Sequence, residues 1–211
     1  GSGKSTIIKL IMRLYDIKDG EIKINNKNIK NFKLSDLRSS ISLVNQDIFL
    51  FAHTILKNIT LFNEELSKKD VVKAAQNIGV WNFINKLPGG LDYNVKERGV
   101  MLSEGQRQII SFLRAYVSKP NILILDEATS SIDSKTEELI QFATNKIIQN
   151  KTSIIIAHRL STIITADKIV VMKSGNIMEI GSHNDLINKN GYYKKLYESQ
   201  FEKKELFAEI F

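Results

Sequence analysis

Several features that define other protein classes are missing from this sequence. None of its 211 residues is a cysteine, which excludes disulfide scaffolds, thiolate metal sites and cysteine nucleophiles. The 2 prolines and 11 glycines are too few for a low-complexity linker. No apolar run approaches the ~20 residues of a membrane-spanning helix, and there is no signal peptide. What remains is an ordinary globular composition, 43% hydrophobic and 25% charged, in a chain long enough to bury a sizeable core.

The sequence also lacks an initiator methionine, because it opens on Gly1. We therefore expect it to be a piece of a longer protein. Its net charge of +7 and pI near 9.4 make nucleic acid, an acidic membrane surface and nucleotide phosphates candidate partners. A global charge locates no site, however, and the simpler explanation, which we favour, is that lysine is abundant in this chain.

Strand patterns alternate with helical patterns along the chain. Short strands are predicted at residues 21–24, 41–44, 122–125 and 154–157, and a hairpin at 169–172 and 176–179. Helical periodicity covers residues 5–15, 54–86, 103–117, 139–147 and 183–211. This alternation predicts an α/β fold with a mainly parallel sheet. A helical insert at 54–100 then separates two sheet-forming regions, 1–53 and 101–211.

The first six residues match the end of a phosphate-binding loop, G-x-x-x-x-G-K-[ST]: Gly1, Ser2, Gly3, Lys4, Ser5 and Thr6. In such a loop the backbone N–H groups surround phosphate oxygens, the lysine reaches the β- and γ-phosphates, and the next hydroxyl binds Mg²⁺. The helix that follows adds its positive N-terminal dipole. The alternative is that Gly-Ser remains from a cleaved tag, but the helical pattern directly after Lys4 favours the loop.

An acidic pair, Asp126-Glu127, ends the apolar strand at 122–125. An ATPase with a phosphate-binding loop needs one acidic residue at the end of a core strand to hold Mg²⁺, and a second to orient or deprotonate the attacking water. Asp126 fits the first role and Glu127 the second. The alternative is an acidic pair that only caps a helix.

The run Leu102-Ser103-Glu104-Gly105-Gln106 lies directly before an amphipathic helix. Ser103 and Gln106 have the spacing of a capping box, so a well-capped helix is one explanation. The same geometry can hold a phosphate at the helix N-terminus. Here the sequence resembles the nucleotide-binding domain of ABC transporters, whose signature is L-S-G-G-Q. Glu104 replaces the first glycine of the signature, and a carboxylate near the phosphate would weaken that half-site.

Other motifs of this family follow in order. Gln46 resembles the Q-loop glutamine, whose amide reaches Mg²⁺ and the attacking water while its loop bends toward the membrane domain. Residues 130–133 resemble the D-loop, which crosses to the partner subunit. His158, within the run 157–162, resembles the switch histidine that contacts the γ-phosphate.

The resemblance extends to a subfamily. Residues 49–51, 54–55 and 58–59 are similar to the stretch after the Q-loop in exporters. Residues 97–99 are similar to the exporter segment that touches the membrane domain's loops. Residues 175–193 have the same exporter character. The resemblance covers essentially all 211 residues, with the phosphate loop interrupted by the start of the chain. The adenine-stacking residue of the family would lie upstream of Gly1, and the cargo is not encoded here.

The resemblance implies a single ABC ATPase domain, residues 1–211, with a P-loop NTPase core at 1–53 and 101–211 and a helical subdomain at 54–100. It implies ATP and Mg²⁺ as cofactors, bound between two head-to-tail domains. The phosphate loop would bind ATP together with Ser103, Gly105 and Gln106 of the other domain. The metal ligands would be Ser5, Gln46 and Asp126, and the catalytic residues Glu127, His158 and Gln46. A membrane domain upstream would place the cassette at the cytoplasmic face of a membrane, with no nucleic acid expected.

Two alternatives remain at this stage. The first is a soluble ABC-type ATPase that acts on nucleic acid or the ribosome, which the basic charge would suit. Asp126 follows Lys4 by only 122 residues, which leaves no room for the long coiled coil of chromosome ATPases, and only one cassette is visible. The second is a non-hydrolysing member of a heterodimer, which Glu104 supports and which Glu127 and His158 oppose.

Overall fold

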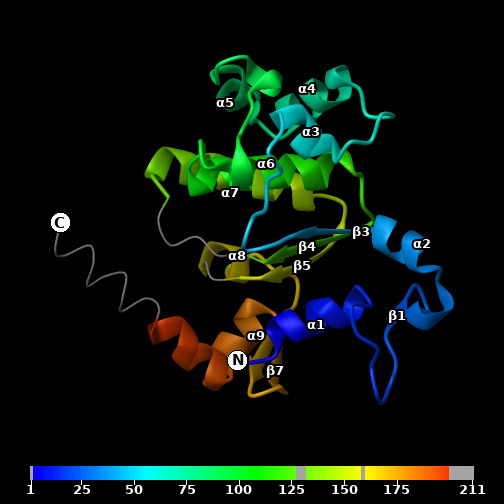
Figure 1. Ribbon diagram of the computed structural model, residues 1–211. Coiled ribbons are helices and arrows are strands. Elements are labelled where there is room, and N and C mark those ends of the chain that lie inside the picture. Colours follow the sequence, from blue (N-terminus) through cyan, green and yellow to red (C-terminus); the bar gives the residue numbers. More distant parts are fainter. Residues whose placement is uncertain (1, 127–131, 158–159, 200–211) are drawn as a thin grey trace. The chain divides into compact units, whose positions relative to one another are not determined.

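The computed structural model describes residues 2–126, 132–157 and 160–199 (Figure 1). The chain forms two compact units, one of residues 23–155 and the other of residues 1–22 with 156–211. Across these described stretches, every helix is too short or too polar to cross a membrane.

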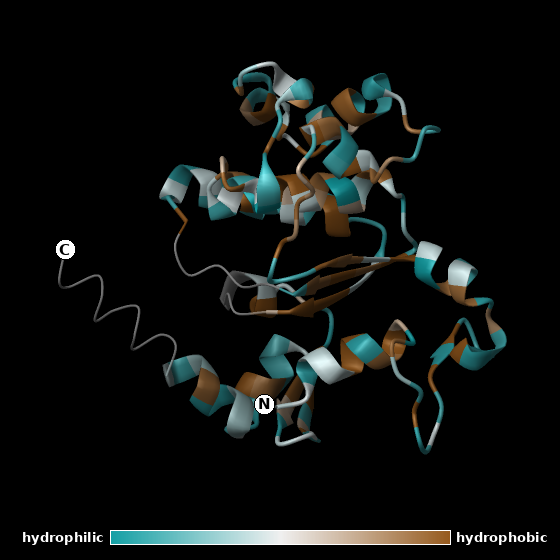
Figure 2. Cartoon of the chain, viewed as in Figure 1, coloured by the Kyte–Doolittle hydropathy of each residue, from teal (hydrophilic) through white to brown (hydrophobic). Residues whose placement is uncertain are grey.

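A three-stranded sheet lies in the larger unit, with β3 (Ile41–Val44), β4 (Ile122–Asp126) and β5 (Thr152–Ile156) in that spatial order. β3 and β4 are parallel, with Ile41 opposite Ile122. The side chains of residues 123–125 on β4 are at most 1% exposed, which is why the sequence here is a continuous apolar run. The predicted α/β fold with a parallel sheet is confirmed, and the strands appear in Figure 2 as a hydrophobic centre.

Helices make up most of the rest of the larger unit: α2 (Leu34–Ser39), α3 (Ile55–Thr60), α4 (Lys68–Asn77), α5 (Trp81–Asn85), α6 (Glu104–Val117) and α7 (Ser134–Ile148). Three short 3₁₀ turns accompany them: η1 (Ile29–Asn31), η2 (Gly90–Asp92) and η3 (Glu97–Gly99). A small antiparallel pair is formed by β1 (Lys23–Ile24) and β2 (Lys27–Asn28). The helical stretch predicted at 54–86 is therefore confirmed as three helices, with breaks near Asn63 and Gly79 as predicted.

Helix α6 lies at the centre of this unit and joins its parts. It packs against α3 and α4, and also against α7 and β3, so that it lies between the smaller helices and the sheet (Figure 1). Its apolar side chains are all but fully buried: Ile109, Ile110, Phe112 and Leu113. A single hydrophobic core therefore runs from the sheet through α6 to the helices of residues 55–85.

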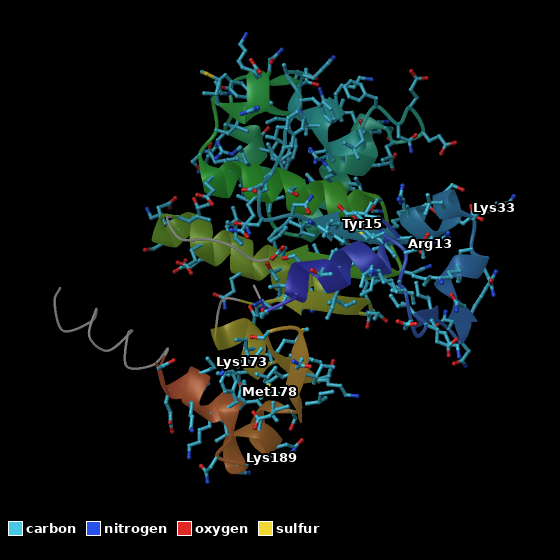
Figure 3. The ribbon with its side chains drawn as sticks, turned by 60° about the horizontal axis from the view of Figure 1, so that its bottom comes forward. Arg13, Tyr15, Lys33, Lys173, Met178 and Lys189 are labelled. Atoms are coloured by element: carbon cyan, nitrogen blue, oxygen red, sulfur yellow. The ribbon has the colours of Figure 1, made fainter. Side chains whose placement is uncertain are left out.

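The smaller unit contains α1 (Lys4–Ile11), α8 (Leu160–Ile164), the hairpin of β6 (Ile169–Lys173) and β7 (Asn176–Gly181), α9 (His183–Asn188) and a helical stretch at residues 192–199. The predicted hairpin is confirmed, and both of its turn residues, Ser174 and Gly175, have positive φ, as tight hairpin turns require. Lys173, labelled in Figure 3, places its ammonium 5.1 Å from the centre of the Tyr192 ring. This contact ties the hairpin to the last helix.

Two helices are shorter than the periodicity predicts. The helix expected at 5–15 ends at Ile11, because Arg13 adopts a positive φ of 48° that stops the helix. The helix expected at 183–211 is broken at residues 189–191, where Asn190 has a positive φ of 52°. After this break, the Glu179 carboxylate accepts hydrogen bonds from the N–H groups of residues 192 and 193 and so caps the second helix. Residues 200–211 lie outside the described part of the chain.

Candidate functional site

The phosphate-loop segment is the N-terminal cap of α1. Gly3 occupies the cap position with φ of 94°, a conformation that favours glycine. The Lys4 ammonium donates to the Ser2 hydroxyl at 2.7 Å. Because α1 begins at Lys4, the N–H groups of its first turn, those of Ser5 and Thr6 included, are oriented outward from the helix start, where an anion is bound most readily. Gly1 lies outside the described residues.

The loop is supported by the hairpin of the same unit. The Gly175 N–H donates to the Ser2 carbonyl at 3.2 Å. A Cβ atom built on Gly3 would lie 3.5 Å from the Gly175 Cα and 3.6 Å from the end of the Met172 side chain. The β6–β7 turn therefore holds the loop at its outer side, a contact that sequence reasoning did not foresee. Tyr15, labelled in Figure 3, is 64% exposed beyond the end of α1.

Gln46 and Asp126 follow the ends of two neighbouring strands. Asp126 is the last residue of β4, and Gln46 comes two residues after β3 ends. Val44 pairs with Leu125 in parallel, so both polar residues extend from the same edge of the sheet. The carboxyl edge of a parallel sheet is where ligands bind in open α/β folds. Glu127, which comes next in the chain, lies outside the described residues, as does His158.

The signature run forms the start of α6. The Ser103 hydroxyl accepts a hydrogen bond from the Gln106 N–H at 3.3 Å, and the Gln106 side chain accepts one from the Ser103 N–H at 3.0 Å. The capping box is therefore complete. The hydroxyl hydrogen of Ser103 is not used in this cap, so it can still donate to a phosphate oxygen. Glu104 is exposed in the first turn, where its charge suits the helix dipole.

Gly105 is buried where α6 approaches the segment that leads into α7. A Cβ atom on Gly105 would lie 2.5 Å from the Thr136 Cγ2 and 3.0 Å from the Ile132 Cγ2, closer than side chains tolerate. This packing joins the signature run to the described end of the predicted D-loop. In that loop, the Asp133 carboxylate caps α7 by accepting from the Thr136 N–H at 3.0 Å. This bond lowers the pKa of Asp133 below its ordinary value. Residues 130 and 131 lie outside the described residues.

The predicted Mg²⁺ ligands offer oxygen donors, which is the chemistry that this ion prefers. They are one hydroxyl, one amide and one carboxylate: Ser5, Gln46 and Asp126. Ser5 belongs to the smaller compact unit and the other two to the larger. In the described part of the chain, no three side chains of His, Asp or Glu converge as a ready-made metal site. A hydroxyl, an amide and a carboxylate are each suitable ligands for a small, hard cation.

Sequence reasoning missed one residue, Arg114, that has a structural role near the carboxyl edge of the sheet. Arg114, on α6, donates through Nε to the Asn58 carbonyl at 2.8 Å and through its two terminal nitrogens to the Phe49 carbonyl at 3.3–3.4 Å. Burial lowers the pKa of its guanidinium. Its only signal in the sequence was an arginine within the apolar half of an amphipathic helix, at Leu113-Arg114-Ala115.

Exposed aromatic rings gather beside this arginine. Phe49 and Phe51 are 55% and 42% exposed, and their rings meet edge to face at a centroid distance of 5.2 Å. Phe62 packs against Phe51 in the same manner at 5.9 Å. Next to them a small hollow is lined by Asp47 and Arg114, among others. Exposed aromatic groups of this kind mark contact surfaces more often than free solvent faces.

Comparison with known proteins decides the family. The profile of the family described as ABC transporter matches residues 1–130, which include the phosphate loop, Gln46, the signature run and the acidic pair. The chain belongs to the ABC transporter family. This ABC domain is of the ATP-binding, ATPase type, as its motifs predicted, and it is similar in sequence and structure to the corresponding part of exporters. The comparisons give no support to a soluble ATPase that acts on nucleic acid or the ribosome.

The relatives of this ABC domain are exporters. Putative multidrug export ATP-binding/permease proteins of Staphylococcus aureus strains NCTC 8325 and COL are each 48% identical over 200 residues, which cover 95% of this chain and 35% of theirs. A solved structure of a bacterial Atm1-family ABC exporter with ATP bound is similar with a TM-score of 0.86 and 39% identity, over 94% of this chain and 35% of that one. The chain thus spans about a third of the length of these relatives.

Proposed function

We propose that this ABC domain binds ATP with Mg²⁺ and hydrolyses it to drive export of a substrate across a membrane. The observation that carries the proposal is the pairing of Val44 with Leu125, which brings Gln46 and Asp126 to one edge of the sheet. An ATPase needs such an edge, because its metal ligand and its water-positioning groups must meet at the same phosphate. The phosphate loop, Gly1 to Thr6, would bind the triphosphate through backbone N–H groups and the Lys4 ammonium.

The proposed chemistry is an in-line displacement at the γ-phosphorus. Glu127 accepts a proton from water as the water oxygen bonds to phosphorus, and the bond from phosphorus to the β–γ bridging oxygen breaks to release ADP and phosphate. Gln46 orients the water, and His158 donates a hydrogen bond to the γ-phosphate. Bound Mg²⁺, held by Ser5, Gln46 and Asp126, would neutralise the negative charge of the phosphates. Catalysis is thus an electrostatic clamp rather than a covalent route.

A second ABC domain is proposed to complete each site. Ser103, Gly105 and Gln106 of that domain would contact the γ-phosphate in a head-to-tail dimer. The free hydroxyl hydrogen of Ser103 and the N–H groups of Glu104 and Gly105 in the first turn of α6 support this role, since the capping box leaves these donors available. ATP closes such a dimer, and hydrolysis with product release reopens it.

A membrane domain is the other proposed partner. The exposed rings of Phe49, Phe51 and Phe62 would contact its loops, and residues 97–99 would lie beside them. The length of the relatives supports this proposal. This chain matches 35% of each relative, which leaves 65% of the relative's length for other domains. The domain would then lie at the cytoplasmic face of a membrane, with residues 54–100 as a helical subdomain between the Q-loop and the signature.

Replacement of Glu127 by glutamine in the membrane-embedded exporter tests the proposal. We expect ATP binding to persist and hydrolysis to fall by about 100-fold or more, because the general base is lost while the binding groups remain. Glu138→Gln, an exposed change on α7, is the matched control and should leave the rate unchanged. Hydrolysis at an unaltered rate in Glu127→Gln would refute the assigned role of Glu127.

A further inference from the structure

Arg114 links two backbone segments that are far apart in the sequence. Its Nε atom bonds the carbonyl of Asn58, in the last turn of α3, and its terminal nitrogens bond the carbonyl of Phe49. The carbonyls of a last helical turn have no partner within the helix, so Arg114 serves as a C-terminal cap for α3 from another helix. Within the described residues, no carboxylate pairs with this guanidinium. Among the described residues this partly buried cation bonds backbone carbonyls, so its contribution is geometric rather than charge pairing.

Asn58 continues this link into the loop that carries the aromatic rings. Its side-chain amide accepts from the Phe51 N–H at 2.8 Å and donates to the carbonyls of Phe51 and Thr54, both at 3.0 Å. The residue is fully buried. Arg114 and Asn58 together therefore make an arginine–asparagine clamp that fixes residues 49–54 by backbone contacts alone, whatever side chains the loop presents.

The clamp connects two surfaces that the proposed function assigns to different partners. Loop 49–54 presents Phe49 and Phe51 to solvent, and α6, which carries Arg114, begins with the signature run at Ser103. A helix is stiff along its axis, so a shift of the loop that is transmitted through Arg114 also moves the first turn of α6. A guanidinium is planar and has donors that face several directions, so it can bond two separate carbonyls at once. A lysine ammonium is a compact point charge without this fixed geometry.

We propose that Arg114 is a positioning residue that fixes loop 49–54 to the signature helix α6, so that the membrane domain's hold on the loop sets the position of the signature run. The inference rests on the proposed function for the identity of that partner. The clamp itself is independent of it, since every contact lies within the larger unit. Arg114 touches neither nucleotide nor metal in this scheme and acts only through the loop and the helix.

The experiment compares Arg114→Met with Arg114→Lys in the membrane-embedded exporter. Methionine removes all three hydrogen bonds but suits a half-buried position, and lysine retains a cation that reaches one carbonyl only. Hydrogen exchange of the peptide over residues 49–58 and ATPase kinetics are measured for each. Lys151→Met is the matched control, because Lys151 is also a partly buried cation that touches α6, with its ammonium 5.3 Å from the Tyr116 ring centre.

For Arg114→Met we expect exchange in 49–58 to rise about tenfold, since three charge-assisted hydrogen bonds to two carbonyls are lost, while exchange elsewhere is unchanged. The kcat should fall by about threefold or more with the KM for ATP within about twofold, because a uniform loss of binding would instead raise KM. Arg114→Lys should recover part of both effects, and Lys151→Met should show neither.

Unchanged exchange over residues 49–58 would overturn the proposal. So would faster exchange over the whole chain together with a lower melting temperature, because Arg114 would then have no local role. An unchanged kcat with faster loop exchange would also overturn it, because the loop would not be linked to catalysis. If Arg114→Met does not fold, Arg114→Lys alone decides by the same measurements. Failure of the proposed function is distinguished by Glu127→Gln, which leaves loop exchange unaltered.

Discussion

The side-chain amide of Asn58 holds the backbone of Phe51 from both sides, accepting from its N–H at 2.8 Å and donating to its carbonyl at 3.0 Å. The amide thus supplies the acceptor and the donor that a neighbouring strand would supply to this backbone in a sheet. Asn58 is 0% exposed, so water cannot replace these bonds if they are lost. The backbone of Phe51 therefore depends on the Asn58 side chain for both of these hydrogen bonds.

Asn58→Ala should therefore be strongly destabilising. Several buried backbone groups lose their partner at once, which corresponds to roughly 2–4 kcal/mol of unfolding free energy. Urea denaturation followed by circular dichroism measures the change. Asn63→Ala is the control, since the Asn63 side chain also accepts from a backbone N–H, that of Glu65 at 2.9 Å, but at an exposed position. Equal losses from the two substitutions would contradict the role of burial.

A side chain at Gly105 should destabilise the fold, because the space around this residue is already filled. In Gly105→Ala the new Cβ would meet the Thr136 Cγ2 at 2.5 Å, so either the Thr136 side chain or the spacing of α6 and α7 must change. We expect a loss of about 1–3 kcal/mol in unfolding free energy. Adding Thr136→Ser removes the Cγ2 atom and should restore part of the loss, whereas Thr136→Ser alone should have little effect. Absence of this rescue in thermal denaturation would show that the contact with Thr136 is not the cause.

Local signals explain which parts of this molecule the sequence predicts. The start of α6 follows from Ser103 and Gln106, because a capping box lies within one turn, and the strands follow from apolar runs that need burial on two faces. The bond between Arg114 and Phe49 joins residues 65 positions apart, and no local pattern encodes it. An arginine in an amphipathic helix normally indicates the solvent face, so periodicity misplaces this one. The roles of Glu127 and His158 stay predictions.

Three aspartates make the stability sensitive to acid. Asp70, Asp133 and Asp185 each cap a helix, and hydrogen bonds from Ser67, Thr136 and Ser182, respectively, lower the pKa of these carboxyls in the folded chain. A lowered folded pKa means that the carboxylates stabilise the fold above their unfolded pKa of about 4, and that this contribution disappears as the pH falls below it. Melting temperatures between pH 6 and pH 2.5 should therefore drop chiefly below about pH 4.

The triple variant of Asp70→Asn, Asp133→Asn and Asp185→Asn tests the assignment. Its melting temperature should be lower than that of the unaltered chain at pH 6 and should approach it as the pH falls, because asparagine cannot lose a charge. The aspartates are not responsible if the two curves stay parallel down to pH 2.5.

Ser103 and Ser67 begin two helices with the same capping box but with different proposed tasks. In both, the serine hydroxyl accepts from a backbone N–H three residues on, at 3.3 Å for Ser103 and 3.2 Å for Ser67. Ser103→Ala and Ser67→Ala should each cost about 1 kcal/mol of unfolding free energy. Only Ser103→Ala should also raise the KM for ATP in the membrane-embedded exporter, because only this hydroxyl is proposed to donate to a phosphate. An equal effect of both on KM would reduce Ser103 to a helix cap.

Glu104 should weaken binding of ATP in the proposed site, although its charge stabilises helix α6. Its carboxylate lies at the first position of α6, where the dipole favours it but a phosphate would be repelled. Glu104→Gly should weaken α6 by about 1 kcal/mol, through the poor helix propensity of glycine and the lost charge, and should still lower the KM for ATP. Glu104→Gln separates these causes, because it removes the charge and keeps a good helix former. If KM falls in Glu104→Gly but not in Glu104→Gln, space rather than charge at this position limits ATP binding.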